Sequence, residues 1–522
     1  MRLRVLGALA SVGTLLVGLL LAGAAAPAAA AGLTFDGQVF SITTNQGLAG
    51  MRVEIVAVND DGSFGAVLLS TTTTDTPGDP GRFVLDLPAT KPAGRAAIRA
   101  VDPAGRYLPS YDNWGRTYPA PYNLAGNGVW DALYSDYAPW RGTSFAMGAA
   151  GRFVPIAPVR VADTRVNGHG PMQRGSWYRI SMPALPGEPV AYVLNVTATG
   201  TQCDASYLAV GMNVVGYVSG AETSIVNARA GADVANLTTI RFGTRYPELG
   251  GDWVQLYNHE CATDVVVDLQ GYYDSGSPDG AGYVPVTPER VVDTRSGAGP
   301  LGAGESRRVD LAALAPDMPD DAVAVAVNLT ATGTTAVTSY LSAYPTGYTP
   351  GRSTSVLNAR QGQDVANVAV VPLADDGSFE VYNDAGRTDV VLDVQGWYTA
   401  TGGVSFFPLD HRRLTTGDAL LGAGQERVVG APGRGIEIPA DAQALAVNLT
   451  SAAGSEATSY VTAYPAGVAR PLASNLNTVR GVDLANSAVV GLGAGGHVLY
   501  NNAGSVLLLE DIQGYFAPGP LD

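Results

Sequence analysis

Asparagine and aspartate recur at matching positions in three stretches of this 522-residue chain. The matching positions are Asn195, Asn328 and Asn448, then Asn227, Asn358 and Asn477, then Asn236, Asn367 and Asn486, then Asn258, Asn383 and Asn501, and finally Asp268, Asp393 and Asp511. Amide and carboxylate oxygens bind Ca²⁺ and accept hydrogen bonds from sugar hydroxyl groups. Calcium, however, is held by about six to eight oxygens that usually include several carboxylates. One recurring aspartate in each stretch provides too few carboxylate ligands for a calcium site.

A structural role explains the same residues better. Asn and Asp are depleted in strands, so their recurrence within apolar, alternating text needs a physical reason. Each stretch also carries a matching arginine, namely Arg160, Arg290 and Arg413. We interpret the set as a buried polar network in which Asn amides close turns and Asp accepts from backbone N–H groups or from these arginines, because buried polar groups must be paired. We predict no metal and no cofactor.

The residue types needed for catalysis do not form a recognisable constellation. None of the four histidines, His169, His259, His411 and His497, recurs between the stretches or stands near an aligned Ser or Cys. The motifs of zinc proteases, serine hydrolases and nucleotide-binding proteins do not occur. The sequence therefore predicts a protein that is not an enzyme.

An aromatic-rich segment at 107–140 is the best candidate for ligand binding. Its rings and acids that could serve a ligand are Trp114, Tyr118, Tyr122, Trp130 and Tyr134, with Asp112 and Asp131. Planar rings cover the apolar faces of sugars while neighbouring polar groups take the hydroxyls. The alternative, which we weigh more heavily, is that the rings pack as a lid on the sandwich before them or form the joint with the first repeat, since aromatic side chains bury large areas wherever they find cover.

The recurring residues belong to a sequence unit that occurs three times in the chain. The copies span 151–273, 282–400 and 404–517, and each contains about eight short runs with period-two alternation, such as Val190–Ala198 and Trp253–Tyr257. Eight alternating strands in about 115 residues favour a jelly-roll-like β-sandwich. Units of this length can each close a core, so we expect each copy to fold by itself.

The segment 32–150 differs from the repeats. Phe35–Phe40, Gly50–Val58, Arg82–Leu87 and Arg95–Val101 alternate apolar and polar residues, and Gly, Pro and Asp mark the turns between them. This pattern predicts a seven-stranded β-sandwich. The whole chain is therefore expected to be all-β, with one N-terminal sandwich followed by three jelly-roll-like repeats.

Two resemblances add context. The text G-x-V, G-L-A-G-M-R-V-E-I, G-R-F-V-L-D-L-P and D-P-A-G-R-Y resembles the prealbumin-like (carboxypeptidase regulatory-like, Cna-B-like) family over about seventy residues. Residues 151–517 resemble a tandem β-repeat of secreted proteins from high-G+C Gram-positive bacteria, through V-P-x-x-P-x-R-x-x-D-T-R, L-N-A-R-x-G and D-V-x-G-[YW]-[YF]. That resemblance implies a location outside the cell but no particular chemistry. The third copy departs from it, with Thr415-Thr-Gly417 in place of Asp-Thr-Arg.

Composition and the N-terminus indicate an exported protein. Residues 1–31 read as a signal peptide, with a basic start, an apolar centre and an alanine-rich end. The net charge of −16 and pI near 4.6 disfavour nucleic acid and anionic membranes as partners. The two cysteines, Cys203 and Cys261, fall in one repeat, and export makes a disulfide between them the expected state.

These features together predict a secreted, non-catalytic protein for cell-surface or extracellular display or adhesion. A polysaccharide is the expected partner, since tandem copies raise avidity for a polymer. Two alternatives stay open, a polysaccharide-active enzyme using the segment 107–140 and a purely structural spacer. The sequence does not specify an oligomeric state.

Overall fold

The structure is a computed structural model. It describes residues 34–519 apart from 42–45, 60–63, 108–109, 113–116, 119–142, 167, 211–222, 242–252, 349–353, 416–418 and 431–437. The signal peptide expected over residues 1–31 lies outside the described residues. Among the residues described, no helix combines the length and apolar character that crossing a bilayer requires.

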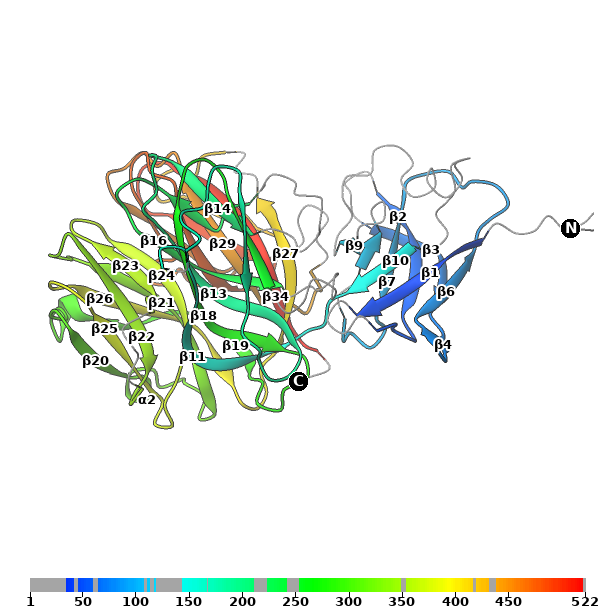
Figure 1. The fold of residues 1–522 in the computed structure, drawn as a ribbon, viewed down its shortest axis with the longest axis horizontal. Coiled ribbons are helices and arrows are strands. Elements are labelled where there is room, and N and C mark those ends of the chain that lie inside the picture. The colour runs from blue at the N-terminus through cyan, green and yellow to red at the C-terminus, as the bar shows by residue number, and fades with distance from the viewer. Residues whose placement is uncertain are drawn as a thin grey trace, which may run out of the picture.

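The N-terminal part is a sandwich of two sheets (Figure 1). The first sheet has the order β10-β1-β6, from β10 (Thr143–Met147), β1 (Thr34–Ser41) and β6 (Arg82–Asp86). The second has the order β3-β2-β7-β8-β9, from β3 (Phe64–Thr72), β2 (Arg52–Val58), β7 (Ala96–Val101), β8 (Ser110–Asp112) and β9 (Thr117–Tyr118). A small hairpin, β4 (Asp75–Thr76) with β5 (Asp79–Pro80), turns at the Pro-Gly pair between them.

Alternation along these strands builds the core between the two sheets. In β1 and β6 every second residue is buried, which brings Phe35, Val39 and Phe83 together with Phe145 of β10. Two carboxylates of this sandwich, Glu54 and Asp102, are buried as well. Glu54 on β2 is 1% exposed and accepts from Arg99 at 2.8 Å, so its charge is paired.

Each repeat folds into two four-stranded sheets. In the first repeat these are β11 (Arg152–Asp163), β18 (Asp264–Asp274), β13 (Pro189–Thr199) and β16 (Val234–Arg241), then β12 (Trp177–Ser181), β17 (Trp253–Asn258), β14 (Ser206–Val210) and β15 (Val226–Ala228). In the second they are β19 (Gly282–Asp293), β26 (Asp389–Thr399), β21 (Ala322–Thr332) and β24 (Val365–Pro372), then β20 (Glu305–Asp310), β25 (Ser378–Asn383), β22 (Thr338–Pro345) and β23 (Leu357–Arg360). In the third they are β27 (Ser405–Thr415), β34 (Leu507–Ala517), β29 (Ala444–Ala452) and β32 (Leu484–Gly491), then β28 (Glu426–Val429), β33 (His497–Asn501), β30 (Ser459–Pro465) and β31 (Leu476–Thr478). The second repeat adds two short helical turns, η2 (Thr294–Ser296) and α2 (Leu311–Leu314).

The strand order is the same in all three repeats and is that of a jelly roll. If the eight strands of a repeat are numbered along the chain, one sheet has the order 1-8-3-6 and the other 2-7-4-5. Each sandwich encloses its own apolar core, built in the first repeat around residues such as Leu194, Val196 and Leu256. The predicted all-β architecture, with a first sandwich and three jelly-roll sandwiches, is confirmed.

The repeats, although each has its own core, do not stand apart as a string. Their 1-8-3-6 sheets face one another and share a further apolar cluster to which all three repeats contribute. Three isolated β-bridges close a ring near the start of each repeat, joining Phe153 to Ala281, Tyr283 to Val404, and Phe406 to Gly151. Because each repeat contacts the other two equivalently, the assembly has a pseudo-threefold axis within one chain.

The aromatic residue that opens each repeat explains a recurring glycine. Gly271, Gly396 and Gly514 lie in the last strand of their repeats, and a Cβ at each would overlap the ring of Phe153, Tyr283 or Phe406 respectively. Glycine is therefore required because the ring lies directly against the backbone. These rings and their neighbours meet at the pseudo-threefold axis, where the hydroxyls of Tyr273 and Tyr398 lie 2.7 Å apart.

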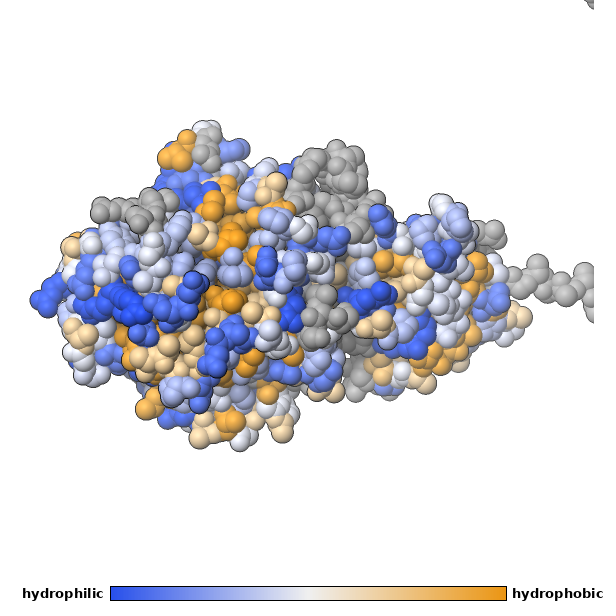
Figure 2. Space-filling model, turned by 90° about the horizontal axis from the view of Figure 1, so that it is seen from below, coloured by the Kyte–Doolittle hydropathy of each residue, from blue (hydrophilic) through white to orange (hydrophobic). Residues whose placement is uncertain are grey.

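The N-terminal sandwich is connected to the repeats next to this ring of bridges. Tyr107 bridges Ala149, and the chain then runs through Ala150 to the bridge between Gly151 and Phe406. Figure 1 shows the sandwich beside the cluster of repeats rather than inserted among them. The face seen from below carries hydrophilic and hydrophobic residues side by side over both parts (Figure 2).

Candidate functional site

The recurring arginine and aspartate pair across neighbouring strands within each repeat. Arg160 on β11 stands opposite Asp268 on β18, and its guanidinium donates to both carboxylate oxygens. Arg290 pairs with Asp393 in the same way, at 2.8 and 3.1 Å. Arg413 and Asp511 form the third pair. Since the three aspartates are 0–1% exposed, each arginine compensates a buried charge.

The first set of asparagines reaches into the neighbouring repeat. Each side-chain amide donates to a serine carbonyl of the next copy at 2.6 Å, and the three bonds join Asn195 to Ser355, Asn328 to Ser474, and Asn448 to Ser224. The N–H groups of the same serines donate back, from Ser355 to Asp268, from Ser474 to Asp393, and from Ser224 to Asp511. The contacts run from the first repeat to the second, to the third, and back to the first.

The third set completes this ring. Asn236 donates to Asn448, Asn367 to Asn195, and Asn486 to Asn328, at 2.8 to 3.0 Å. Each of these amides also donates to a carbonyl of its own repeat, for example from Asn367 to Val356. We expected the asparagines to close turns inside each repeat, and for these two sets that expectation is wrong. They hold the repeats to one another, because the face that carries them is covered by the next copy.

The fourth recurring set of asparagines does close turns, as expected. Asn258, Asn383 and Asn501 end the seventh strand of their repeats, and each amide donates to three carbonyls of nearby loops. In the first repeat the acceptors include Met172 and Cys261. This position fixes the loop ends, and its side-chain N–H groups are all engaged by these carbonyls.

Burial dominates the electrostatics of the recurring aspartates. Removal from water raises the pKa of Asp268 and Asp511 to about 6, and the paired arginines and the serine N–H groups lower these values only in part. The pKa of Asp393 is raised for the same reason. In contrast, the pKa of Asp163 is lowered by the hydrogen bonds that Arg165 donates to it. Burial thus makes the ionised form of the recurring aspartates costly in free energy. The carboxylate of the Asp-Thr-Arg motif, in contrast, is stabilised in its ionised form.

A groove of about 320 Å³ lies between the first and second repeats. Its polar lining combines residues of both copies, namely Arg160, Arg165, Thr197, Thr199, Asp233, Tyr340, Thr354, Ser355 and Asn358. The amide nitrogen of Asn358 and the hydroxyl of Thr197 are buried in the wall and have no hydrogen-bond partner among the described residues. A volume of this size suits a small ligand, and unpaired polar atoms favour one that can hydrogen-bond.

Arg165 of the Asp-Thr-Arg motif lines this groove. Arg165 donates to both oxygens of Asp163, at 2.9 and 2.7 Å, and Arg295 makes the same pair with Asp293. The intervening threonines, Thr164 and Thr294, donate to the carboxylates at the start of the last strand, at 2.6 and 2.7 Å. The third copy lacks this arrangement in its sequence, and residues 416–418 lie outside the described residues.

Sequence reasoning missed the threonines that face the groove. Thr197 lies two residues after Asn195, so the period-two rule places both on one face of β13. The equivalent Thr330 and Thr450 recur at the same spacing, and the structure shows no hydrogen-bond partner for the three hydroxyls among the residues it describes. The period-two spacing in the sequence already placed these threonines on the same face as the asparagines. That this face is turned towards the neighbouring repeat became visible only in the structure.

Most of the aromatic candidate segment lies outside the described residues, including Trp114, Tyr122, Trp130, Tyr134 and Asp131. The backbone of Asp112 ends β8, and Tyr118 belongs to β9, which pairs with β8. The segment thus begins as an extension of the five-stranded sheet.

The disulfide between Cys203 and Cys261 is present and joins two loops of the first repeat, with Cα atoms 6.0 Å apart. The equivalent loops of the second repeat meet at Ala336 and Gly386, where a Cβ added to the glycine would lie 2.8 Å from that of the alanine. The cross-link therefore reinforces a contact that the shared fold already makes. Within the described residues no three His, Cys, Asp or Glu side chains gather in a way that could hold a metal ion.

Comparisons with known proteins give little further guidance. No family model matches the chain, and no curated protein matches it. Among solved structures, one titled for the triple jelly-roll fold and turret assembly of an archaeal virus is similar over 71% of this chain and 90% of its own, at 10% identity and a TM-score of 0.16. A structure of Sulfolobus Turreted Icosahedral Virus covers 72% and 92%, at 10% identity and a TM-score of 0.14. Likenesses this weak carry no argument about function.

Proposed function

We propose that this protein is an exported, non-catalytic display or adhesion protein that binds a carbohydrate polymer in the grooves between its repeats. The observation that carries the proposal is the groove between the first two repeats, where the Asn358 amide and the Thr197 hydroxyl are buried and have no partner among the described residues. Hydroxyl groups of a sugar would pair with both, and the Tyr340 ring in the same wall offers an apolar face.

The closed assembly supports binding to a polymer. Unpaired threonine hydroxyls recur at the position of Thr197 in the other two repeats, as Thr330 and Thr450, so a long glycan could engage more than one repeat. The same closure disfavours a spacer, because repeats joined in a ring do not extend the reach of the chain. Export is supported by the signal-like residues 1–31 and by the disulfide, which persists in oxidising compartments.

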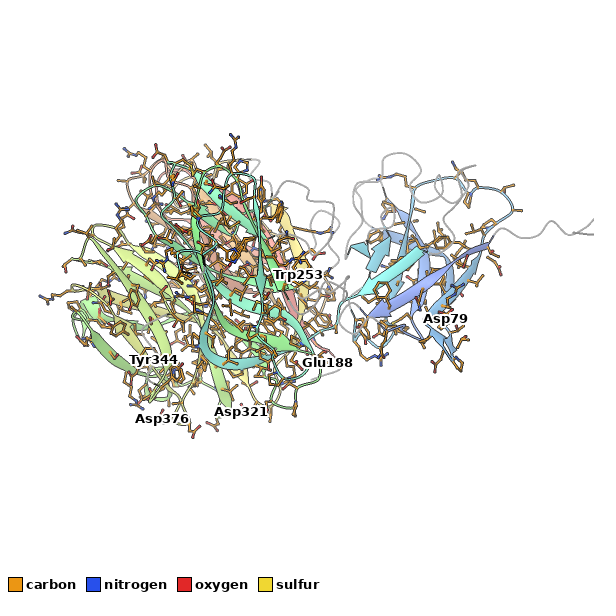
Figure 3. All side chains as sticks on the ribbon, in the orientation of Figure 1. Asp79, Glu188, Trp253, Asp321, Tyr344 and Asp376 are labelled. Carbon is orange, nitrogen blue, oxygen red and sulfur yellow. A yellow bond between two sulfur atoms is a disulfide. The ribbon has the colours of Figure 1, made fainter. Side chains whose placement is uncertain are left out.

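A glycan array probed with the full chain, followed by titration of the best polysaccharide, tests this function. Thr197→Val combined with Asn358→Leu removes two donors from the groove and is expected to weaken binding about thirtyfold, since two hydrogen bonds of about 1 kcal/mol each are lost. The matched control is Arg308→Gln. Arg308 pairs with Asp376 at 2.9 Å on the outer part of the second repeat, where Figure 3 labels Asp376 near Tyr344 and Asp321.

Other outcomes would redirect the assignment. Unchanged binding by the groove variant, together with loss of binding by Trp114→Ala and Trp130→Ala, would place the ligand site in the aromatic segment. Turnover of a polysaccharide would overturn the non-catalytic assignment, and failure to bind any glycan would favour a purely structural role.

A further inference from the structure

A second cavity, of about 60 Å³, lies on the pseudo-threefold axis, at the end of the strands opposite the ring of aromatic residues. All three repeats contribute equivalent residues to its wall. The apolar part of the lining comes from the start of the sixth strand of each copy, with Val234 and Ala235, Val365 and Ala366, and Leu484 and Ala485. The cavity is therefore a product of the closed assembly and is present in no single repeat.

Two arginines from equivalent positions line this cavity. Arg229 is the last residue of V-N-A-R in the first repeat, and Arg360 is the last residue of L-N-A-R in the second. The third repeat has Val479 at that position. One terminal nitrogen of Arg229, Nη1, is buried and has no hydrogen-bond partner among the described residues. The other, Nη2, donates to the side-chain oxygen of Gln363 at 3.3 Å, and Arg360 donates to the carbonyl of Gly231. All of these acceptors are neutral.

The guanidinium of Arg229 is thus not offset by a nearby carboxylate. Its pKa is lowered, first by burial and then by the like charge of Arg360. Two aspartates do line the cavity, but they are engaged elsewhere. Asp233 accepts from Thr199 at 2.5 Å and raises the pKa of Arg165, and Asp364 accepts from Thr332 at 2.5 Å and raises that of Arg295.

We propose that the axial cavity binds a small oxyanion, held between Arg229 and Arg360. A carboxylate, phosphate or sulfate group presents oxygens that match the planar fork of a guanidinium. Such a group accepts from the buried Nη1 of Arg229 and offsets the repulsion between the two arginines. The cavity admits a single small group, so the ligand is either a free anion or the acidic end of a larger molecule. The cavity shares Asp233 and Asn358 with the groove between the first two repeats, but Arg229 and Arg360 line the cavity alone.

The test is the melting temperature of the full chain in NaCl at constant ionic strength, with sulfate, phosphate or acetate replacing chloride. A ligand that binds only the folded state raises the melting temperature with its concentration. We expect this rise in the natural protein and its loss in Arg229→Gln. The control is Arg174→Gln, which removes an arginine that is 74% exposed and pairs with Glu260, and which is expected to keep the rise.

Two features separate an anion site from a structural role of the arginine. Without oxyanion, Arg229→Gln is expected to melt at or above the temperature of the natural protein, because it relieves an uncompensated buried charge. At high sulfate concentration the natural protein is expected to have the higher melting temperature of the two. Val479→Arg completes the ring of three arginines and is expected to bind sulfate at least tenfold more tightly, as measured by titration calorimetry.

Equal stabilisation of the natural protein and Arg229→Gln by sulfate, or a natural protein that is more stable than the variant without any oxyanion, would overturn the proposal. Should Arg229→Gln fail to fold, calorimetry on Arg360→Gln and Val479→Arg decides, since weaker and tighter binding respectively are required. A larger effect of sulfate or phosphate than of acetate assigns a free inorganic anion, and the reverse assigns the carboxylate of a larger ligand.

Discussion

At the scale of residues, this protein uses asparagine to join its repeats. An asparagine side chain both donates and accepts, so each member of the ring can satisfy a backbone group and another asparagine at once. Asn195, for example, donates to Ser355 and accepts from Asn367. A charged residue in that place would require a buried counter-ion, and an apolar one would leave the serine carbonyl unpaired. The recurrence of Asn195 and Asn236 and their counterparts therefore follows from the interface and requires no ligand.

The raised pKa of the buried aspartates predicts how the free energy of unfolding depends on pH. The folded state raises the pKa of Asp268 from 3.8 to about 6 because burial outweighs the pairing with Arg160. The stability that this group contributes is then fully present below pH 3.8 and is lost as the pH rises through about 6. The free energy of unfolding of the natural protein, minus that of Asp268→Asn, is expected to fall between pH 4 and pH 7, by at most about 3 kcal/mol. Denaturant titrations at several pH values measure this difference.

Taking the difference between the two proteins removes the effect of other carboxylates, such as Asp163, whose lowered pKa acts in the opposite direction. A difference that grows as the pH rises would show that the ion pair with Arg160 outweighs burial.

At the scale of elements, the last strand of each repeat is shaped by an aromatic ring from the first strand. The Tyr283 ring lies on Gly396, and its hydroxyl donates to the carbonyl of Gln395 at 2.9 Å. The side chain of that glutamine in turn accepts from the N–H of Val489 in the third repeat at 2.9 Å. One strand thus combines packing inside its repeat with a bond to the next repeat.

Gly396→Ala tests this packing. The added methyl group would overlap the Tyr283 ring, so the ring must leave its site and lose its hydrogen bond to Gln395. We expect the free energy of unfolding to decrease by about 1–3 kcal/mol, as is usual for overpacking in a tight interior. Gly302→Ala is the matched control, because a Cβ there would meet only the side chain of Glu305 at 3.4 Å. Similar losses in both variants would contradict the role given to the ring.

At the scale of the whole molecule, three similar domains behave as one closed body. Each has its own core, but the faces that carry Val193, Ala326 and Ala446 are buried only by the other repeats. The chain thereby achieves within one polypeptide what a symmetric homotrimer achieves with three. The grooves and the axial cavity both exist only in that assembled state.

An excised second repeat, residues 282–400, should reveal this dependence. Removing its neighbours exposes Val368, Tyr398 and the Asn328 amide, so we expect the fragment to self-associate, with closed trimers as the favoured product because the three repeats present equivalent surfaces. Sedimentation at increasing concentration measures this association. A fragment that stays monomeric and melts as sharply as the full chain would show that the interface is not needed for stability.

Much of this architecture was predictable from the sequence. Period-two alternation gave the strands, the threefold copying gave the repeat boundaries, and two cysteines in one repeat indicated the disulfide. Alternation also placed Asp268 and Gln270 on one face of β18 and Val267 and Leu269 on the other, as the burial of the latter pair in the core shows. These features are local, since a strand's inward and outward faces are encoded in neighbouring residues.

The sequence by itself thus determined that the chain is all-β, that it contains three copies of one unit, and that Asn and Asp recur in step with those copies. Only the tertiary structure decided that Asn195 bonds to Ser355 of another repeat, that Thr197 and Asn358 share a groove, and that Arg229 and Arg360 meet on an axis. The physical reason is that alternation records which side of a strand is covered but not by what. The covering surface comes from residues more than one hundred positions away, and their placement depends on how three folded domains close around a common axis.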